Sequence, residues 1–124
     1  MSVTGGMMAE FDPDAERAAR DWLALADVGD TAGTWAASAP LFQRAVPPDT
    51  WARALDAARA PLGAVVARTL RTARPATELP GAPDGEYVVF EFDTQFTHKR
   101  SAVETVTPMR DSDGRWRVSG YFIR

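Results

Sequence analysis

The chain has 124 residues, a formal net charge of −3 and 45% hydrophobic residues, which is typical of one globular domain. Its basic residues are scattered along the chain, which argues against a nucleic-acid-binding surface. The chain has no cysteine and only one histidine, so disulfides, thiol nucleophiles and cysteine- or histidine-based metal sites are excluded, and we expect no metal and no cofactor.

The first half of the sequence predicts about three helices. In FDPDAERAARDWLALADVGD, Asp12 can cap a helix that Gly29 ends, and apolar residues recur at helical spacing between them. A shorter helix follows and ends before Pro40. A third helix begins near Pro48 and is broken by Pro61.

Beyond Gly63 the hydrophobic pattern alternates, which is typical of strands. We expect strands near residues 64–72, 86–97, 101–110 and from 115 onward. The short THKR and RDSDGR links between the later strands indicate hairpins. Helices followed by antiparallel strands predict an α+β domain, with about three N-terminal helices packed on one face of a curved, mainly antiparallel sheet of about four strands.

The register of this sheet follows if His98 and Lys99 form a two-residue turn. Asp93 then lies beside Glu104, and Glu104 beside Tyr121, on the face turned away from the helices. The residues expected to face the helices are Val88, Phe90, Phe92, Phe96, Val103, Met109, Trp116, Val118, Gly120 and Phe122. Since glycine has no side chain, Gly120 is expected to leave space on that inner face.

Most of the chain from about residue 15 onward resembles a bacterial family known as domain of unknown function 4019. The matching segments are AARDWLALADVGDTAGTWAASAPLF, WARALDAARAPLGAVVARTL, LPGAPDGEYVVFEFDTQF and AVETVTPMRDSDGRWRVSGYFIR. The resemblance implies a fold similar in outline to the nuclear transport factor 2-like and cystatin-like folds. It implies no activity, cofactor or catalytic residue, because none is established for the family. The resemblance also implies export, as for many bacterial relatives, although the start MSVTGGMMAEF lacks an export signal.

The expected row of Asp93, Glu104 and Tyr121 provides candidate catalytic residues. Neighbouring carboxylates repel, so one of them can keep its proton near neutral pH, and a tyrosine can donate a hydrogen bond to it. The alternative, which we favour, is a solvated or arginine-paired row with no catalytic role.

Aromatic residues suggest two further sites. A ligand pocket between helices and sheet would be lined by Trp22, Trp35, Trp51, Phe90, Phe92, Trp116, Gly120 and Phe122, although such residues more often form a filled core. A homodimer interface on the outer sheet face would use Tyr87, Val89, Val106, Arg117, Tyr121 and Ile123.

The sequence therefore favours a non-enzymatic domain that binds a partner chain or a small apolar ligand, as a homodimer. The alternative is a small isomerase or hydratase with Asp93 or Glu104 as base and Tyr121 as donor. We expect residues 1–10 to be disordered, residues 11–124 to form a single domain, and no residue run to span a membrane. The sequence leaves the location open: the start as written indicates a cytoplasmic protein, and the alternative is an exported, periplasmic protein from which a signal segment has been removed.

Overall fold

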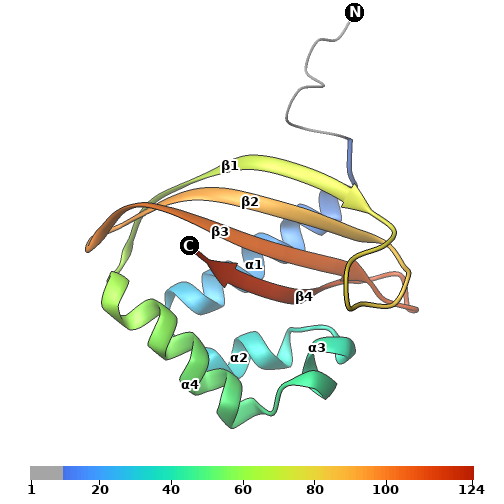
Figure 1. Ribbon diagram of the computed structural model, residues 1–124, viewed down its shortest axis with the longest axis horizontal. Helices are drawn as coiled ribbons and strands as arrows, with labels where there is room; N and C mark the ends of the chain where they lie inside the picture. The colour runs from blue at the N-terminus through green and yellow to red at the C-terminus, as the bar shows by residue number, and fades with distance from the viewer. Residues whose placement is uncertain (1–9) are drawn as a thin grey trace, which may run out of the picture.

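The computed structural model describes residues 10–124, so the disorder expected for the start of the chain lies outside the described residues except at Glu10. The order of elements is helices first and strands afterwards, as Figure 1 shows. The helices are α1 (Pro13–Asp27), α2 (Thr31–Ala36), α3 (Pro40–Ala45) and α4 (Pro48–Arg59), with a 3₁₀ turn at Ala60–Leu62. The strands are β1 (Val65–Ala76), β2 (Tyr87–Phe96), β3 (Lys99–Arg110) and β4 (Trp116–Ile123). The expected α+β class is confirmed.

The sheet is antiparallel and its strands follow chain order, β1-β2-β3-β4, so β1 and β4 are its edges. Figure 1 shows α1 behind the arched sheet, and α2, α3 and α4 on the side of the β4 edge. The helix α1 contacts β2, β3 and β4, which makes it the main cover of the inner sheet face.

Local signals determine where the first helix begins. The Asp12 side chain accepts a hydrogen bond of 2.9 Å from the backbone N–H of Asp14, and Pro13 occupies the first helical position. The predicted cap is therefore confirmed. The short helix α3 was not expected, because its six residues are too few to show a hydrophobic period.

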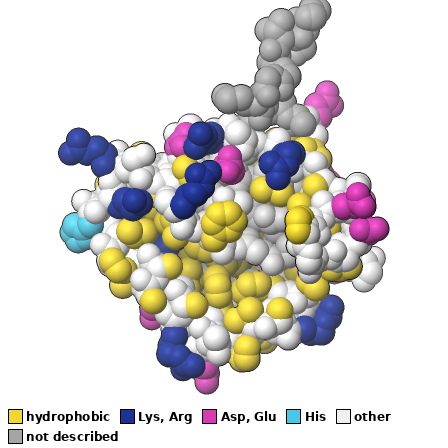
Figure 2. Space-filling view, viewed as in Figure 1, with side chains coloured by type: hydrophobic (Ala, Val, Ile, Leu, Met, Phe, Trp, Pro, Cys, Tyr) yellow, Lys and Arg dark blue, Asp and Glu magenta, His cyan; other side chains and the backbone are white. Residues whose placement is uncertain are grey.

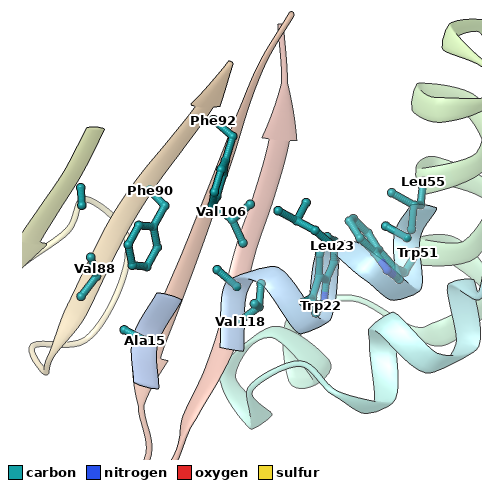
Figure 3. Packing of buried hydrophobic residues seen from close by; sticks show 13 residues of the cluster. Ala15, Trp22, Leu23, Trp51, Leu55, Val88, Phe90, Phe92, Val106 and Val118 are labelled. Carbon is teal, nitrogen blue, oxygen red and sulfur yellow. The ribbon is translucent and has the colours of Figure 1, made fainter. Parts of the chain in front are cut away.

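The core lies between α1, Trp51 and Leu55 of α4, and the inner sheet face (Figure 3). Trp22 and Leu23 of α1 point into it, and Phe90 and Phe92 of β2 meet them from the sheet. All four side chains are at most 2% exposed. The indole Nε1 of Trp22 donates to the carbonyl of Thr34 at 3.0 Å, so the one polar atom of this side chain is also satisfied.

The predicted register is wrong by one residue between β2 and β3. Glu104 lies opposite Phe92 instead of Asp93, because the hairpin turns at Thr97–His98, where Phe96 pairs with Lys99, and an irregularity between Thr94 and Phe96 then shifts the pairing by one residue. Since side chains alternate between the two faces of a strand, this slip turns Glu104 inward.

A second irregularity shifts the pairing between β3 and β4. A bulge at Ser119 separates the Pro108–Val118 pair from the Thr107–Gly120 pair. Tyr121 consequently lies beside Val106, faces inward and contacts Trp22, whereas Phe122 faces outward with 57% of its surface exposed. The same slips turn Val103 and Met109 outward, against expectation.

Candidate functional site

A buried carboxylate lies at the centre of the inner sheet face. Glu104 is fully buried, and its Oε1 accepts hydrogen bonds from Arg68 Nε at 2.8 Å and Thr94 Oγ1 at 2.6 Å. Its Oε2 accepts from Tyr121 Oη at 2.6 Å and from Arg59 Nη1 at 3.3 Å. Each oxygen therefore has two donors, which is the degree of satisfaction that a buried charge requires.

Asp27 completes the cluster from the other side. Its Oδ1 accepts from Arg59 Nη2 at 2.7 Å, and its two oxygens form a bidentate pair with Arg68 at 2.8 and 2.9 Å. Asp27 is the last residue of α1 and Arg59 the last of α4. The cluster, hereafter the ionic cluster (Asp27, Arg59, Arg68, Thr94, Glu104 and Tyr121), thus joins two helix ends to β1 and β3, and its two positive and two negative charges cancel.

Burial and pairing shift the titration of the ionic cluster. Burial alone would raise the pKa of Asp27, but hydrogen bonds from Arg68 and Arg59 outweigh it and hold that pKa below its ordinary value. Burial, and then the charge of Glu104, raise the pKa of Tyr121 well above the ordinary range of a phenol. Tyr121 is therefore a protonated donor at all physiological pH values.

One polar atom of the ionic cluster is unsatisfied. Within residues 10–124, the Nε of Arg59 is buried without a hydrogen-bond partner. The guanidinium carbon lies 5.1 Å from the centre of the Phe96 ring, a distance at which the ring face attracts a cation and offsets part of the desolvation cost.

The structure brings two of the three candidate catalytic residues together. Glu104 and Tyr121 are hydrogen-bonded, but Asp93 is on the other sheet face, 59% exposed at its side chain and 3.7 Å from Arg71. The partners Asp27 and Arg59 were not predicted. They are charged residues at the ends of amphipathic helices, a position where a charge is usually solvated, so the sequence gives no strong signal for them.

The residues predicted to line an inner pocket fall into two groups. Trp22, Trp51, Phe90 and Phe92 form the filled core, with the Trp22 ring centre 6.1 Å from that of Trp51. Trp35 and Trp116 are half-buried at its margin, and their indole N–H groups donate to Val46 O and Asp12 Oδ2. Gly120 and Phe122 instead line a groove on the molecular surface.

This groove follows the edge of β4 between α3 and the β1–β2 loop, and has a volume of about 350 Å³. Figure 2 shows hydrophobic side chains gathered in the middle of the face that carries β4, where the surface is hollowed. Most lining residues are apolar or glycine. The β4 groove, as it is called below, is lined by Leu41, Phe42, Ala45, Leu79, Pro80, Gly81, Ala82, Tyr87, Thr107, Ser119, Gly120, Tyr121 and Phe122.

Three local features keep the β4 groove open. A Cβ atom built on Gly120 would meet no heavy atom within 4 Å, so the space beside this glycine is empty. The Tyr87 hydroxyl donates to the carbonyl of Pro83 at 2.6 Å and anchors the β1–β2 loop above the sheet. Across the groove, Phe42 packs edge-on against Trp51 at 4.9 Å, which fixes α3 to the core.

The six residues predicted as a dimer interface do not share one surface. Tyr87, Val89 and Arg117 belong to the outer face, where Tyr87 is covered by the loop and Arg117 pairs with Asp111 and Asp113. Val106 is fully buried, and Tyr121 and Ile123 are also on the inner face. The face assignment is wrong for the latter three because of the register slips. The homodimer itself stays a prediction.

Among residues 10–124, no group of three or more histidine or acidic side chains is arranged to hold a metal ion. None of the helices in this part of the chain has the length and apolar character needed to cross a bilayer.

The fold and the two sites define a small α+β domain with an internal ionic cluster and an apolar surface groove. The chain belongs to the family described as "Protein of unknown function (DUF4019)", which matches residues 18–121 and so confirms the resemblance seen in the sequence. No curated protein and no solved structure matches the chain.

Proposed function

We propose that this protein is a non-enzymatic binding domain and that the β4 groove receives an apolar group of its ligand. The observation that carries the proposal is the empty space beside Gly120 within an apolar surface hollow. Small-molecule and side-chain binding sites are concave and mostly apolar, with few polar groups.

The exposure of Phe122 supports the proposal. More than half of its surface is in contact with water, although it lines the β4 groove. Each square ångström of apolar surface removed from water stabilises by about 25 cal/mol. A ligand that covers Phe122 and fills the space beside Gly120 therefore gains free energy that the protein alone leaves unused.

The geometry does not favour the alternative of an isomerase or hydratase. A general base needs a free lone pair within reach of a substrate proton. Glu104 is fully buried, both of its oxygens accept two hydrogen bonds, and two arginines neutralise it. The ionic cluster is better explained as a structural joint between the helices and the sheet.

The test uses Nile red, an uncharged dye that fluoresces in apolar surroundings. Wild-type protein is expected to bind it with saturable fluorescence, and Gly120→Leu to reduce the affinity at least tenfold, because leucine fills the empty space. Gly120→Ala should have an intermediate effect. Since the space contains no protein atom, both variants should unfold at or slightly above the wild-type denaturant midpoint.

The matched control is Val66→Leu, which enlarges a side chain that is 56% exposed on β1, the opposite edge of the sheet. It should leave dye binding unchanged. Equal dye affinity in wild type and Gly120→Leu, with both folded, would refute the β4 groove as the binding site.

Three further expectations belong with this proposal. A likeness to the nuclear transport factor 2-like and cystatin-like folds is supported by the helices packed on a curved sheet (Figure 1), and a bacterial origin is proposed from the resemblance seen in the sequence. A homodimer is tested by sedimentation velocity, in which a concentration-independent monomer at tens of micromolar would exclude it.

A further inference from the structure

We propose that the occupant of the β4 groove is an extended peptide of a partner protein, which pairs with the free edge of β4 as a fifth strand. This inference rests on the proposed function and names the class of ligand. The backbone of β4 carries this inference, whereas the side chains of the β4 groove carry the proposed function.

The hydrogen bonds at the end of β4 show which backbone groups point outward. Arg124 and Val103 exchange two bonds, from Val103 N to Arg124 O at 2.9 Å and from Arg124 N to Val103 O at 3.1 Å. In an antiparallel pair, residues that exchange both bonds alternate with residues whose N–H and C=O point away from the neighbour. Tyr121 and Ile123 are therefore the residues of β4 that direct their backbone groups to the open side.

These outward groups are unoccupied in the described part of the chain. The earlier part of the edge is closed, because the N–H of Ala39 donates to the carbonyl of Val118 at 2.7 Å. Beyond the bulge, residues 10–124 provide no hydrogen bond to the N–H of Tyr121 or Ile123. Two donors and two acceptors consequently follow this edge at the spacing of an extended chain, those of Tyr121 in the β4 groove and those of Ile123 two residues further along β4.

The opposite edge of the sheet is protected in ways that this part of β4 is not. The strand β1 carries Arg71 and Arg74, and Pro75 near its end. Charged side chains and proline are the usual devices that prevent an edge strand from pairing with another chain. Between Ser119 and Ile123, β4 has no charged residue and no proline. The contrast marks the β4 edge as the one available for pairing.

The surroundings of this edge fit a single peptide better than a second folded copy. Figure 1 shows α3 and α4 on the open side of β4. In a symmetric dimer through β4, both copies would bring these helices to the same place. A peptide brings no helices of its own, and the β4 groove follows this edge between α3 and the β1–β2 loop, where the peptide would lie. Added strands bind in this manner elsewhere, with affinity from the backbone and specificity from alternate side-chain pockets.

The side chains of the groove indicate the composition of the peptide. Alternate residues of an added strand point to opposite faces of the sheet. On one face they would meet Gly120 and Phe122, and on the other Leu41 and Phe42 of α3. The partner segment is therefore apolar at two or more neighbouring positions and extended over about four residues.

The experiment selects binders from a library of random octapeptides displayed on phage, with wild-type protein as target. Binders are synthesised and titrated by isothermal calorimetry. For each binder, single N-methyl groups are introduced along the backbone. The proposal predicts that methylation at every second position weakens binding at least tenfold, and that methylation at the positions between has little effect, because only alternate N–H groups face β4.

Ile123→Pro tests the same pairing from the protein side. Its outward N–H takes no part in the β3–β4 ladder, so proline leaves that ladder complete while removing a donor to the peptide. The variant should bind the peptides at least tenfold more weakly and bind Nile red as the wild type does. Should it fail to fold, the N-methyl series on wild-type protein decides alone.

The two proposals fail in different ways. Peptides whose affinity is indifferent to N-methylation at every position, or a library that yields no binder, would overturn the strand addition while leaving Nile red binding intact. Equal Nile red affinity in wild type and Gly120→Leu would overturn the proposed function, and with it the strand addition that rests on it. If the wild type is a dimer and Ile123→Pro is a monomer, the occupant of the β4 groove is a second copy of the chain, and the proposal of a partner peptide is overturned.

Discussion

Glu104→Gln is the substitution that tests the ionic cluster most severely. Glutamine keeps the shape of the side chain and one acceptor oxygen, but it removes a negative charge that is fully buried between Arg59 and Arg68. Those arginines, 10% and 12% exposed, are then balanced only by Asp27. Removing one partner of a buried ion pair costs about 3–5 kcal/mol, because the other charge stays buried without compensation.

This cost is a large part of the stability of a domain, which is about 5–15 kcal/mol in total. We expect the free energy of unfolding in urea to fall by about 3–5 kcal/mol with an unchanged m-value. The corresponding fall in thermal midpoint is roughly 10–20 °C for a chain of this size.

The matched control is Glu91→Gln on the outer sheet face. Glu91 also accepts from an arginine, Arg124, at 3.1 Å and from a threonine, Thr72, at 3.0 Å, but its side chain is 28% exposed. An exposed pair of this kind is worth about 1 kcal/mol or less. Equal losses for the two glutamine variants would refute the claim that the ionic cluster is a buried structural joint.

Two further predictions concern pH and the core. Since the pKa of Asp27 is lower in the folded than in the unfolded chain, where it is about 3.9, its stabilising effect is present above that pH and is lost as the pH falls through the folded value. The free energy of unfolding in urea, measured at pH values from 7 down to 2.5, should therefore fall less in Asp27→Asn than in the wild type. The control is Asp21→Asn, on the exposed side of the same helix, in which the free energy should fall as in the wild type. An identical fall in all three proteins would contradict the pairing of Asp27 with the arginines. Trp22→Ala should destabilise by about 3–5 kcal/mol, because the side chain is 2% exposed, whereas Trp116→Ala, at the half-buried margin, should cost clearly less. Equal urea midpoints for the two alanine variants would show that the core is placed wrongly.

The helices and the class of the fold could be predicted because their signals are local. The Asp12 cap and proline at the first helical position are adjacent in sequence, and the alternation of the later segments marks strands without reference to their partners. The register depended on the turn and on an irregularity beside it. THKR permits a turn at either Thr97–His98 or His98–Lys99, and that choice moves the pairing by two residues. The irregularity between Thr94 and Phe96 moves it by one residue and decides on which face Glu104 lies.

The two sites were harder to predict for different reasons. The ionic cluster joins residues as distant as Asp27 and Glu104, and an arginine on a strand gives no sign of whether it faces water or a carboxylate. The β4 groove depends on the bulge at Ser119 and on the path of Leu79–Ala82, a loop whose conformation has no periodic signature. Only Gly120, as a glycine within a strand, indicated open space.

The most direct measurement is a two-dimensional ¹H–¹⁵N NMR titration of the wild-type protein with indole, a small apolar probe. Binding in the β4 groove predicts that the largest shifts of amide signals occur at Gly120, Tyr121 and Phe122, together with Leu41 and Gly81 across the groove, and that Gly120→Leu abolishes them. Shifts centred on the outer sheet face, or shifts of equal size in Gly120→Leu, would contradict the assignment of the β4 groove as the binding site.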